Sequence, residues 1–232
     1  MISAFAVVVA GGRGSRFGGP VPKQFHLVLG RPLLAYSLSS FARCRTIERT
    51  VLVLPRAGFE EAERTIAPHI EGAAVEVVAG GDTRQASVWA GVSRLGDSDS
   101  RLVAVHDGAR PLVSPQLIES VVEAASRHGG AIAAVPVVET LKEVSQDGFV
   151  QGTADRKRYW RAQTPQCFRL GLLRRAFDAA RRDGFLGTDE ASLVERLSAP
   201  IVIVPGEEQN LKVTSLHDVE RMEYYIGQNA RR

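Results

Sequence analysis

Residues 4–24 read AFAVVVAGGRGSRFGGPVPKQ, and this stretch decides the fold class and points to the chemistry. Its apolar start, Ala4–Val9, predicts a buried strand, and a glycine-rich loop follows that strand directly. Glycines let the backbone approach a ligand closely and present successive N–H groups to an anion. Arg16 and Lys23 add two positive charges to the loop. The stretch therefore predicts a strand that opens into a polyphosphate site.

The same residues exclude two better-known types of phosphate-binding loop. A dinucleotide-binding fingerprint needs a glycine where Phe17 stands, and it leads into a helix that Pro20 and Pro22 would break. A Walker loop needs Gly-Lys followed by Ser or Thr, whereas Lys23 is followed by Gln24. A plain surface loop between a strand and a helix stays open as the alternative.

Length and composition predict a single α/β domain over residues 1–232, with 44% hydrophobic and 24% charged residues. We expect no membrane segment and no signal peptide, because no apolar run is long enough and the first residues lack a basic leader. Two cysteines without metal or disulfide spacing favour the cytoplasm. The net charge of +3 comes without a basic, aromatic-rich stretch, so nucleic acid is not an expected partner.

The chain uses arginine far more often than lysine as its positively charged residue. It holds 25 arginines and only four lysines, which are Lys23, Lys142, Lys157 and Lys212. Lysine supplies a compact ammonium, which arginine cannot replace. We interpret the retained lysines as supporting evidence for sites that need such a charge.

Strand-like and helix-like segments alternate over most of the sequence. The strand-like runs are 4–9, 51–54, 75–78, 102–106, 131–135 and 201–204. Runs that are apolar throughout suit a parallel sheet covered on both faces. Apolar residues at helical spacing fill the segments between them, for example from Leu117 to Ala125 after Ser114-Pro115. The pattern predicts a doubly wound, mainly parallel, Rossmann-like sheet with its ligand at the carboxyl ends of the strands.

One segment, at about 137–155, departs from this alternation. Residues 140–144 and 149–153 flank Asp147-Gly148, which predicts a β-hairpin. The hairpin carries little apolar surface to bury against the core, and an isolated hairpin is only marginally stable. We expect it to project as an arm and to pack on a second copy of the chain.

Further segments at strand ends carry candidate site residues. Asp107 ends the strand-like run at 102–106, opposite the glycine loop, and is a candidate Mg²⁺ ligand, with Arg110 available for a second anion. An ion pair between these two residues is the alternative. Residues 80–87 lead from another strand into a helix, where Ser87 could hydrogen-bond a base; an ordinary capped helix start is equally compatible.

Together, eight segments resemble 2-C-methyl-D-erythritol 4-phosphate cytidylyltransferases, the bacterial and plastid isoprenoid enzymes. They occur in the family's order, at 11–24, 80–91, 105–111, 140–142, 155–156, 164–166, 188–192 and 210–214. The resemblance implies that the acceptor's 4-phosphate attacks the α-phosphorus of CTP and releases pyrophosphate, with Mg²⁺ or another divalent cation as cofactor. It also implies a nucleotidyltransferase sheet and a homodimer formed through the arm.

The resemblance further implies roles for individual residues, with Arg16 and Lys23 neutralising the α,β-phosphates. Its catalytic residues would be Arg16, Lys23, Arg156 and Lys212. CTP would be bound by Ala10, Gly11, Gly12, Arg13, Gly14, Gly81, Asp82 and Ser87. The acceptor would be bound by Asp107, Arg110, Thr140, Arg156, Thr164, Thr188 and Lys212, with Asp107 also holding the metal and Thr140, Arg156 and Thr164 coming from the partner's arm.

Two positions depart from the family pattern. Ala10-Gly11-Gly12 replaces the common Ala-Ala-Gly and also occurs in ribitol-5-phosphate cytidylyltransferases, which are the nearest alternative. Gln209 stands where some relatives carry an aspartate beside the metal. A sugar-1-phosphate nucleotidyltransferase and a non-catalytic nucleotide-binding module are more distant alternatives, and the second is disfavoured by cations at both reacting groups.

Overall fold

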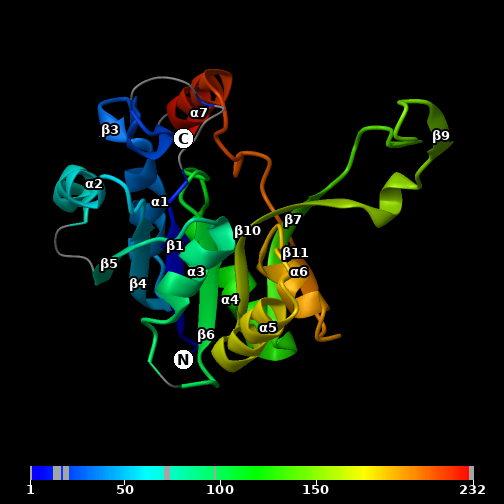
Figure 1. The fold of residues 1–232 in the computed structure, drawn as a ribbon. Coiled ribbons are helices and arrows are strands. Elements are labelled where there is room, and N and C mark those ends of the chain that lie inside the picture. Colours follow the sequence, from blue (N-terminus) through cyan, green and yellow to red (C-terminus); the bar gives the residue numbers. More distant parts are fainter. Residues whose placement is uncertain (1, 13–16, 18–20, 71–73, 97, 230–232) are drawn as a thin grey trace.

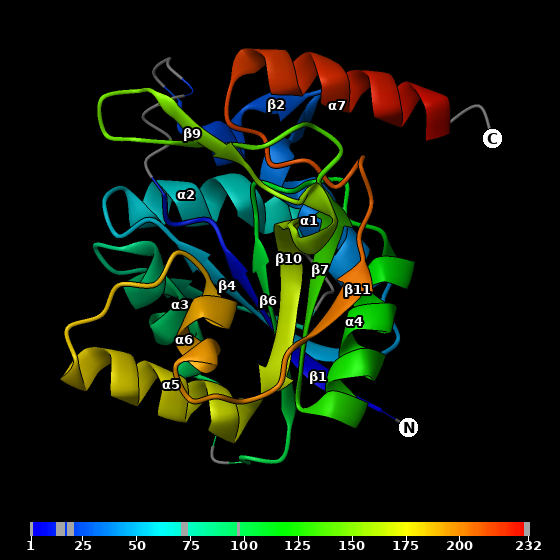
Figure 2. The ribbon, with the colours of Figure 1, turned by 90° about the vertical axis from the view of Figure 1, so that its right-hand side faces the viewer.

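The computed structural model describes residues 2–12, 17, 21–70, 74–96 and 98–229. Within them, seven strands form one sheet in the order β11-β7-β10-β6-β1-β4-β5 (Figures 1 and 2). These strands are β1 (Ala4–Val9), β4 (Ile47–Leu54), β5 (Val75–Ala79), β6 (Leu102–Asp107), β7 (Gly130–Pro136), β10 (Trp160–Arg169) and β11 (Val202–Pro205). All pairings are parallel except those of β10, which runs antiparallel to β6 and β7. The predicted doubly wound, mainly parallel sheet is confirmed.

Helices cover both faces of the sheet, as Figure 2 shows. They are α1 (Leu33–Ala42), α2 (Phe59–Ile66), α3 (Arg84–Val92), α4 (Pro115–His128), α5 (Leu170–Arg182), α6 (Glu190–Glu195) and α7 (Leu216–Asn229). One core cluster joins α1, α2 and α4 to the sheet, and a second joins α3, α5 and α6 to the opposite face. Along β1, Ala6 and Val8 belong to the first cluster and Val7 to the second, which explains why an apolar residue stands at every position.

Helix α4 shows how local sequence fixes the element boundaries. Ser114 accepts a hydrogen bond from the Leu117 N–H at 3.0 Å, and Pro115 occupies the first turn. The helix ends at Gly129, whose φ of 88° is a conformation that side-chain-bearing residues rarely adopt. The predicted start and stop of this helix are confirmed.

A third cluster joins the beginning of the chain to its end. Val28 and Leu33, near the short strands β2 (Leu27–Val28) and β3 (Arg31–Pro32), pack against Val213, Val219 and Met222. These five side chains are at most 7% exposed. Burying an aliphatic side chain of this size contributes roughly 1.5–3 kcal/mol, so the cluster anchors α7 over the edge of the sheet where β1 ends.

The hairpin arm forms as expected, from β8 (Lys142–Val144) and β9 (Val150–Thr153), which pair antiparallel. Figure 1 shows it projecting from the layered body between β7 and β10. As expected, the arm buries little apolar surface against the core, because Val144, Phe149 and Val150 are 57%, 74% and 63% exposed. The arm therefore presents apolar side chains away from the body.

Strand β10 was not predicted. Its middle reads Gln163-Thr164-Pro165-Gln166. This stretch is polar and contains a proline, so it does not show the apolar, proline-free pattern of a central strand. The structure accommodates the proline through a cis Thr164–Pro165 bond and a register shift between Ala162 and Gln166 against β7. The strand carries polar side chains into the sheet edge that holds the candidate site.

Candidate active site

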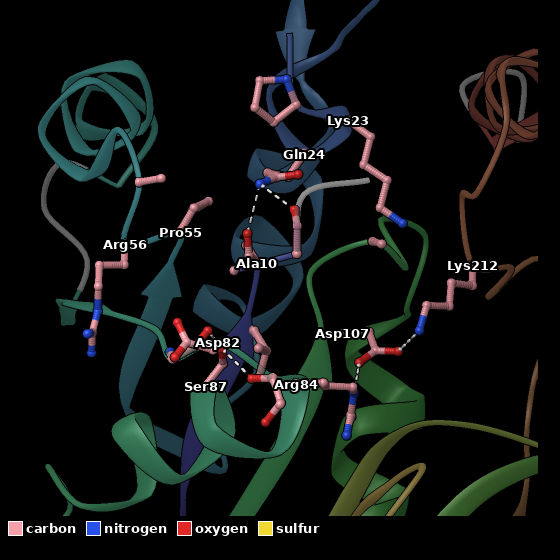
Figure 3. Close-up of a pocket in the computed structure, with 18 residues that line it drawn as sticks. Ala10, Lys23, Gln24, Pro55, Arg56, Asp82, Arg84, Ser87, Asp107 and Lys212 are labelled. Carbon is pink, nitrogen blue, oxygen red and sulfur yellow. Dashed lines mark hydrogen bonds and ion pairs between the residues drawn. The ribbon is translucent and has the colours of Figure 1, made fainter. Parts of the chain in front are cut away.

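A cavity of about 880 Å³ opens where β1, β4 and β6 end (Figure 3). It is lined by the predicted residues Ala10, Gly11, Gly12, Lys23, Gly81, Asp82, Ser87, Asp107 and Lys212. Five segments far apart in the sequence therefore meet around it. The predicted residues Arg13, Gly14 and Arg16 lie outside the described part of the chain.

Gln24 fixes the start of the glycine loop. The side chain is 2% exposed, and its amide nitrogen donates to the carbonyl oxygens of Ala10 at 2.9 Å and Gly12 at 3.2 Å. The Ala10 N–H itself donates to the Val53 carbonyl at 2.8 Å. Because the C=O and the next N–H of a trans peptide point in opposite directions, holding the Ala10 carbonyl turns the Gly11 N–H away from Gln24.

The loop at 80–87 is held by its own side chains. Ser87 donates from Oγ to the Thr83 carbonyl at 2.9 Å, and the Gly81 N–H donates to the same Oγ at 3.2 Å. A Cβ added at Gly80 would lie 2.8 Å from this Oγ, so the glycine permits the close approach. Thr83 caps α3 by accepting from the Ala86 N–H. Asp82 is exposed and lines the cavity, so the loop presents a carboxylate and backbone groups to a ligand.

Asp107, at the end of β6, lies between two cations, as Figure 3 shows. Arg84 Nε donates to Oδ1 at 3.0 Å and Lys212 Nζ donates to Oδ2 at 2.7 Å. Burial alone would raise the pKa of the Asp107 carboxyl, but Arg84 and Lys212 outweigh burial and hold that pKa well below its usual range. The carboxylate is therefore ionised, and both of its oxygens are engaged.

This arrangement bears on the predicted metal role of Asp107. Each Asp107 oxygen accepts one hydrogen bond from a cation and keeps a second lone pair, so a metal ion bound there would lie close to the positive charges of Arg84 and Lys212. No group of three or more His, Cys, Asp and Glu side chains that could hold a metal occurs among the described residues. The described residues therefore supply no complete set of protein ligands for a cation, and the divalent cofactor stays a prediction.

A smaller cavity of about 220 Å³ lies on the other side of Asp107. It is lined by the predicted acceptor residues Asp107, Arg110, Thr164, Thr188 and Lys212, together with Arg84, Ala162, Gln163, Gln166 and Asp189. Arg84, Asp107 and Lys212 line both cavities and so form their common wall. A ligand in one cavity would be a direct neighbour of a ligand in the other.

Hydrogen bonds connect the polar groups around this smaller cavity. The Thr164 hydroxyl accepts from the Asp107 N–H at 3.0 Å and pairs with His106 Nδ1 at 3.0 Å. Arg110 donates to the carbonyl oxygens of Asn210 at 2.9 Å and Ala162 at 3.3 Å. Burial lowers the pKa of His106 to about 4, so this fully enclosed imidazole is neutral at pH 7. The network holds Arg110 and Thr164 in place. Thr164 lies in β10 and lines the smaller cavity of its own chain, so the expectation that it comes from the partner's arm is wrong.

Thr140 and Arg156 are the predicted acceptor residues that line neither cavity. Thr140 lies in the arm, and Arg156 is at its base in the short helix η3 (Arg156–Arg158), where it donates to the Val138 carbonyl at 2.5 Å. Both are exposed. Within one copy of the chain they are separate from the rest of the predicted set.

The lining residues to which the sequence analysis gave no role include Gln24, Arg56 and Arg84. A signal existed for Arg56, because it follows the end of β4, and ligands of parallel sheets bind at such ends. Arg84 stands inside the segment already quoted at 80–87, but its partners are remote in sequence. No local sequence pattern could have identified these partners of Arg84.

No helix of the described residues is long and apolar enough to cross a membrane.

The family profile, the curated relatives and the solved structures all point to one family, and each matches nearly the full length of this chain. The IspD family profile, described as 2-C-methyl-D-erythritol 4-phosphate cytidylyltransferase, matches residues 4–228. The protein of that name from Symbiobacterium thermophilum is 41% identical over 225 residues, covering 97% of this chain and 93% of the relative. The crystal structure of the Thermus thermophilus protein of that name aligns with a TM-score of 0.76 at 33% identity, covering 97% of this chain and 98% of that one. A 4-diphosphocytidyl-2C-methyl-D-erythritol synthase from Anaerococcus prevotii aligns at 0.83 with 26% identity, covering 97% and 99%.

Proposed function

The chain belongs to the 2-C-methyl-D-erythritol 4-phosphate cytidylyltransferase family, and from that membership we propose that it transfers CMP from CTP to 2-C-methyl-D-erythritol 4-phosphate. The products are 4-diphosphocytidyl-2-C-methyl-D-erythritol and pyrophosphate, in non-mevalonate isoprenoid precursor synthesis. The observation that carries the proposal is the common wall of Arg84, Asp107 and Lys212 between the two cavities. A nucleotide in one cavity and a second anion in the other would be direct neighbours across these three residues.

In this reaction an oxygen of the acceptor phosphate forms a bond to the α-phosphorus of CTP. The bond from that phosphorus to the bridging oxygen breaks, and pyrophosphate leaves with the electron pair. No general base is needed, because the attacking oxygen is already anionic. The barrier comes from bringing two anions together, so fixed cations and correct positioning are what the protein must supply.

The lining of the two cavities supports an assignment of these roles to residues of this chain. The glycine loop, Lys23 and the loop at 80–87 surround the larger cavity, and we assign CTP to it. Lys212 and Arg110 border the smaller cavity, and we assign the acceptor phosphate to it. Lys212 reaches both cavities, so its ammonium lies where the two reacting phosphates would meet.

We further propose that the enzyme is a homodimer in which the arm of one copy completes the acceptor cavity of the other. Thr140 and Arg156 line neither cavity of their own chain. Phe149 and its neighbours expose apolar surface on the same arm, which a second copy could cover.

The divalent cation would arrive with the triphosphate, since Mg²⁺ binds readily to phosphate oxygens with few protein ligands. Both cysteines are free and buried, which agrees with the proposed cytoplasmic location.

Pyrophosphate release from CTP tests the proposal. The purified chain is incubated with Mg²⁺ and either 2-C-methyl-D-erythritol 4-phosphate or ribitol 5-phosphate. We expect release with the first acceptor alone. Preference for ribitol 5-phosphate would reassign the acceptor, and no release with either would reject the transferase.

A further inference from the structure

Arg84 is the first residue of α3 and lies on the wall between the two cavities. The sequence resemblance gave it no role. Its side chain is 29% exposed and contacts two carboxylates from different parts of the chain, Asp107 at the end of β6 and Glu190 at the start of α6. Arg84 therefore links the nucleotide side of the site to the segment that carries Thr188.

The guanidinium is held along two edges. Nη1 donates to Glu190 Oε1 at 2.7 Å and Nη2 donates to Glu190 Oε2 at 2.9 Å. Nε then donates to Asp107 Oδ1 at 3.0 Å. A planar fork bound at both terminal nitrogens has little freedom left, so the direction of the Nε–H bond is fixed by Glu190.

Glu190 is itself well anchored, with a side chain that is 1% exposed. Its segment is fixed by a capping box, in which Asp189 accepts from the Ser192 N–H at 3.0 Å. Gln166 donates to Asp189 at 2.8 Å and accepts from the Ala191 N–H at 3.0 Å. The Glu190 carboxylate therefore belongs to a rigid support, and Glu190 lines neither cavity.

The charges form a row that alternates in sign: Glu190, Arg84, Asp107 and Lys212. At the end of this row, the Lys212 ammonium is 2.7 Å from Asp107 Oδ2. A lysine is a flexible point charge, and its side chain is 38% exposed here, so its location depends on the carboxylate that holds it. That carboxylate is oriented by Arg84.

We propose that Arg84, held by Glu190, is a positioning residue: it orients Asp107, and through Asp107 it places the Lys212 ammonium between the nucleotide and the acceptor phosphate. The proposal rests on the proposed function, because it assigns Lys212 to the transfer reaction. Arg84 acts through Asp107 and needs no contact with a substrate. The other reading is a purely structural ion pair that joins α3 to α6, and the two readings differ in measurable ways.

Two conservative variants test the proposal. Arg84→Lys keeps one charge but cannot donate along two edges, and Glu190→Gln keeps the shape of the support while weakening one of its bonds. For both we expect kcat/KM for the acceptor to fall about tenfold or more, as for other small misplacements of a reacting charge, while KM for CTP changes less than about twofold. If Arg84→Lys fails to fold, Glu190→Gln carries the test.

The matched control is Arg94→Lys. Arg94 follows α3 and pairs with Glu76 at 2.6 Å, but it is 58% exposed and lines neither cavity. We expect wild-type kinetics from it. Melting temperatures of all variants separate lost stability from lost positioning. A loss of stability with unchanged kinetics of the folded protein would overturn the proposal.

A double-variant cycle tests whether Arg84 acts through Asp107. Adding Arg84→Lys to Asp107→Asn should cost little beyond Asp107→Asn alone, since the intermediary is already lost. If the fold-losses in kcat/KM of the two single variants multiply in the double variant, Arg84 does not act through Asp107 and the proposal is overturned. A mainly CTP-specific effect of Arg84→Lys would overturn it too, by pointing to direct nucleotide contact.

A crystal structure of Glu190→Gln supplies a readout that needs no activity. We expect the Asp107 carboxylate and the Lys212 ammonium to leave their present positions. If both stay in place, the positioning proposal fails whatever the protein catalyses. If instead the wild-type chain releases no pyrophosphate, the proposed function fails, and the two failures are thus distinguishable.

Discussion

The Nζ atom of Lys23 donates a 2.9 Å hydrogen bond to the carbonyl oxygen of Val213, although 190 residues separate the two. The residue before Val213 is Lys212, whose ammonium pairs with Asp107. One short segment near the end of the chain therefore helps to place both lysines. The Val213 N–H in turn donates to the Ala109 carbonyl at 2.8 Å, which fixes that segment to the end of β6. Two cations are thus held in the cavity by contacts within the protein.

Replacement of Lys23 by alanine should reduce kcat by about 10²–10³-fold, comparable to the loss of one oxyanion-stabilising donor. The reason is that a fixed positive charge beside the nucleotide phosphates is removed. Pyrophosphate release at saturating CTP and acceptor measures the effect. Arg175→Ala, which removes an exposed cation from α5, is the control and should leave kcat unchanged. An unaltered kcat in Lys23→Ala would remove this lysine from the mechanism.

Replacement of Arg156 by alanine should raise KM for the acceptor and leave KM for CTP unchanged, because we place Arg156 beside the acceptor of the partner copy. Steady-state kinetics with each substrate varied in turn provide the measurement. Arg158→Ala, at the other end of the same short helix, is the matched control. An effect confined to KM for CTP would contradict the placement.

Mixing two impaired variants, assayed at an acceptor concentration far below the raised KM of Arg156→Ala, tests whether the site is shared between copies. In a dimer of one Arg156→Ala chain and one Lys212→Ala chain, one site would carry both defects and the other site neither. Random reassortment should therefore restore about one quarter of wild-type activity. Activity is assayed after the variants exchange subunits, with each variant alone as the control. No recovery from subunits that demonstrably exchange would place both residues in one chain's site.

Gln24→Leu should raise KM for CTP about tenfold and affect KM for the acceptor much less. The substitution leaves the carbonyl oxygens of Ala10 and Gly12 without their donor, and an unsatisfied buried carbonyl costs about 1–3 kcal/mol. Isothermal titration with CMP gives a second, activity-free measure of the same loss. Gln116→Leu, at an exposed position in α4, should change neither quantity. Equal effects on both substrates would mean that Gln24 supports the whole site rather than the glycine loop.

Asp218 should make the stability of the protein depend on pH. Burial would raise the pKa of this carboxyl, but hydrogen bonds from the N–H and hydroxyl groups of Thr214 and Ser215 outweigh it and lower that pKa. The bonds join Asp218 to the residues just before α7, as in a capping box. Their stabilisation is complete above the unfolded-state pKa of about 3.9 and is lost as the pH falls through the lower folded-state pKa.

Urea unfolding from about pH 7 down to about pH 2 tests this. Asp218→Asn should lower the free energy of unfolding by about 1 kcal/mol at neutral pH, and the difference from wild type should shrink at the acid end. Asp178→Asn, which removes a 55% exposed carboxylate from a surface pair, is the control. A difference that is constant with pH would show that the charge of Asp218 is not what stabilises the cap.

The sequence predicted those parts of the fold that repeat a local pattern. Apolar runs such as Ala4–Val9 and capped helices such as α4 carry their own signal, and so does the Asp147-Gly148 hairpin. Strand β10 escaped prediction because its position in the sheet depends on pairing with β6 and β7 rather than on its own polar sequence. Its proline and its register shift are explained by tertiary pairing, which no short window contains.

The same distinction applies to the site. Loops after strands predicted a shared edge, and most of the described candidates do line the two cavities there. The partners of individual side chains were not predictable, because Arg84 meets Glu190 across 106 residues and Lys23 meets Val213 across 190. Such pairs follow from the packing of helices and loops around the sheet. The separation of Thr140 and Arg156 from the cavities also required the structure, since it depends on the direction of the arm.

The cluster that joins Val28 and Leu33 to Val213 and Met222 has a consequence for synthesis. A ribosome delivers the glycine loop first and its last supporting residues only after most of the chain has emerged. The sheet strands β1, β4 and β6 can assemble earlier, but the Lys23–Val213 bond cannot. The nascent chain must therefore carry Lys23 without its Val213 partner through most of translation, and the larger cavity takes its final form only as α7 docks.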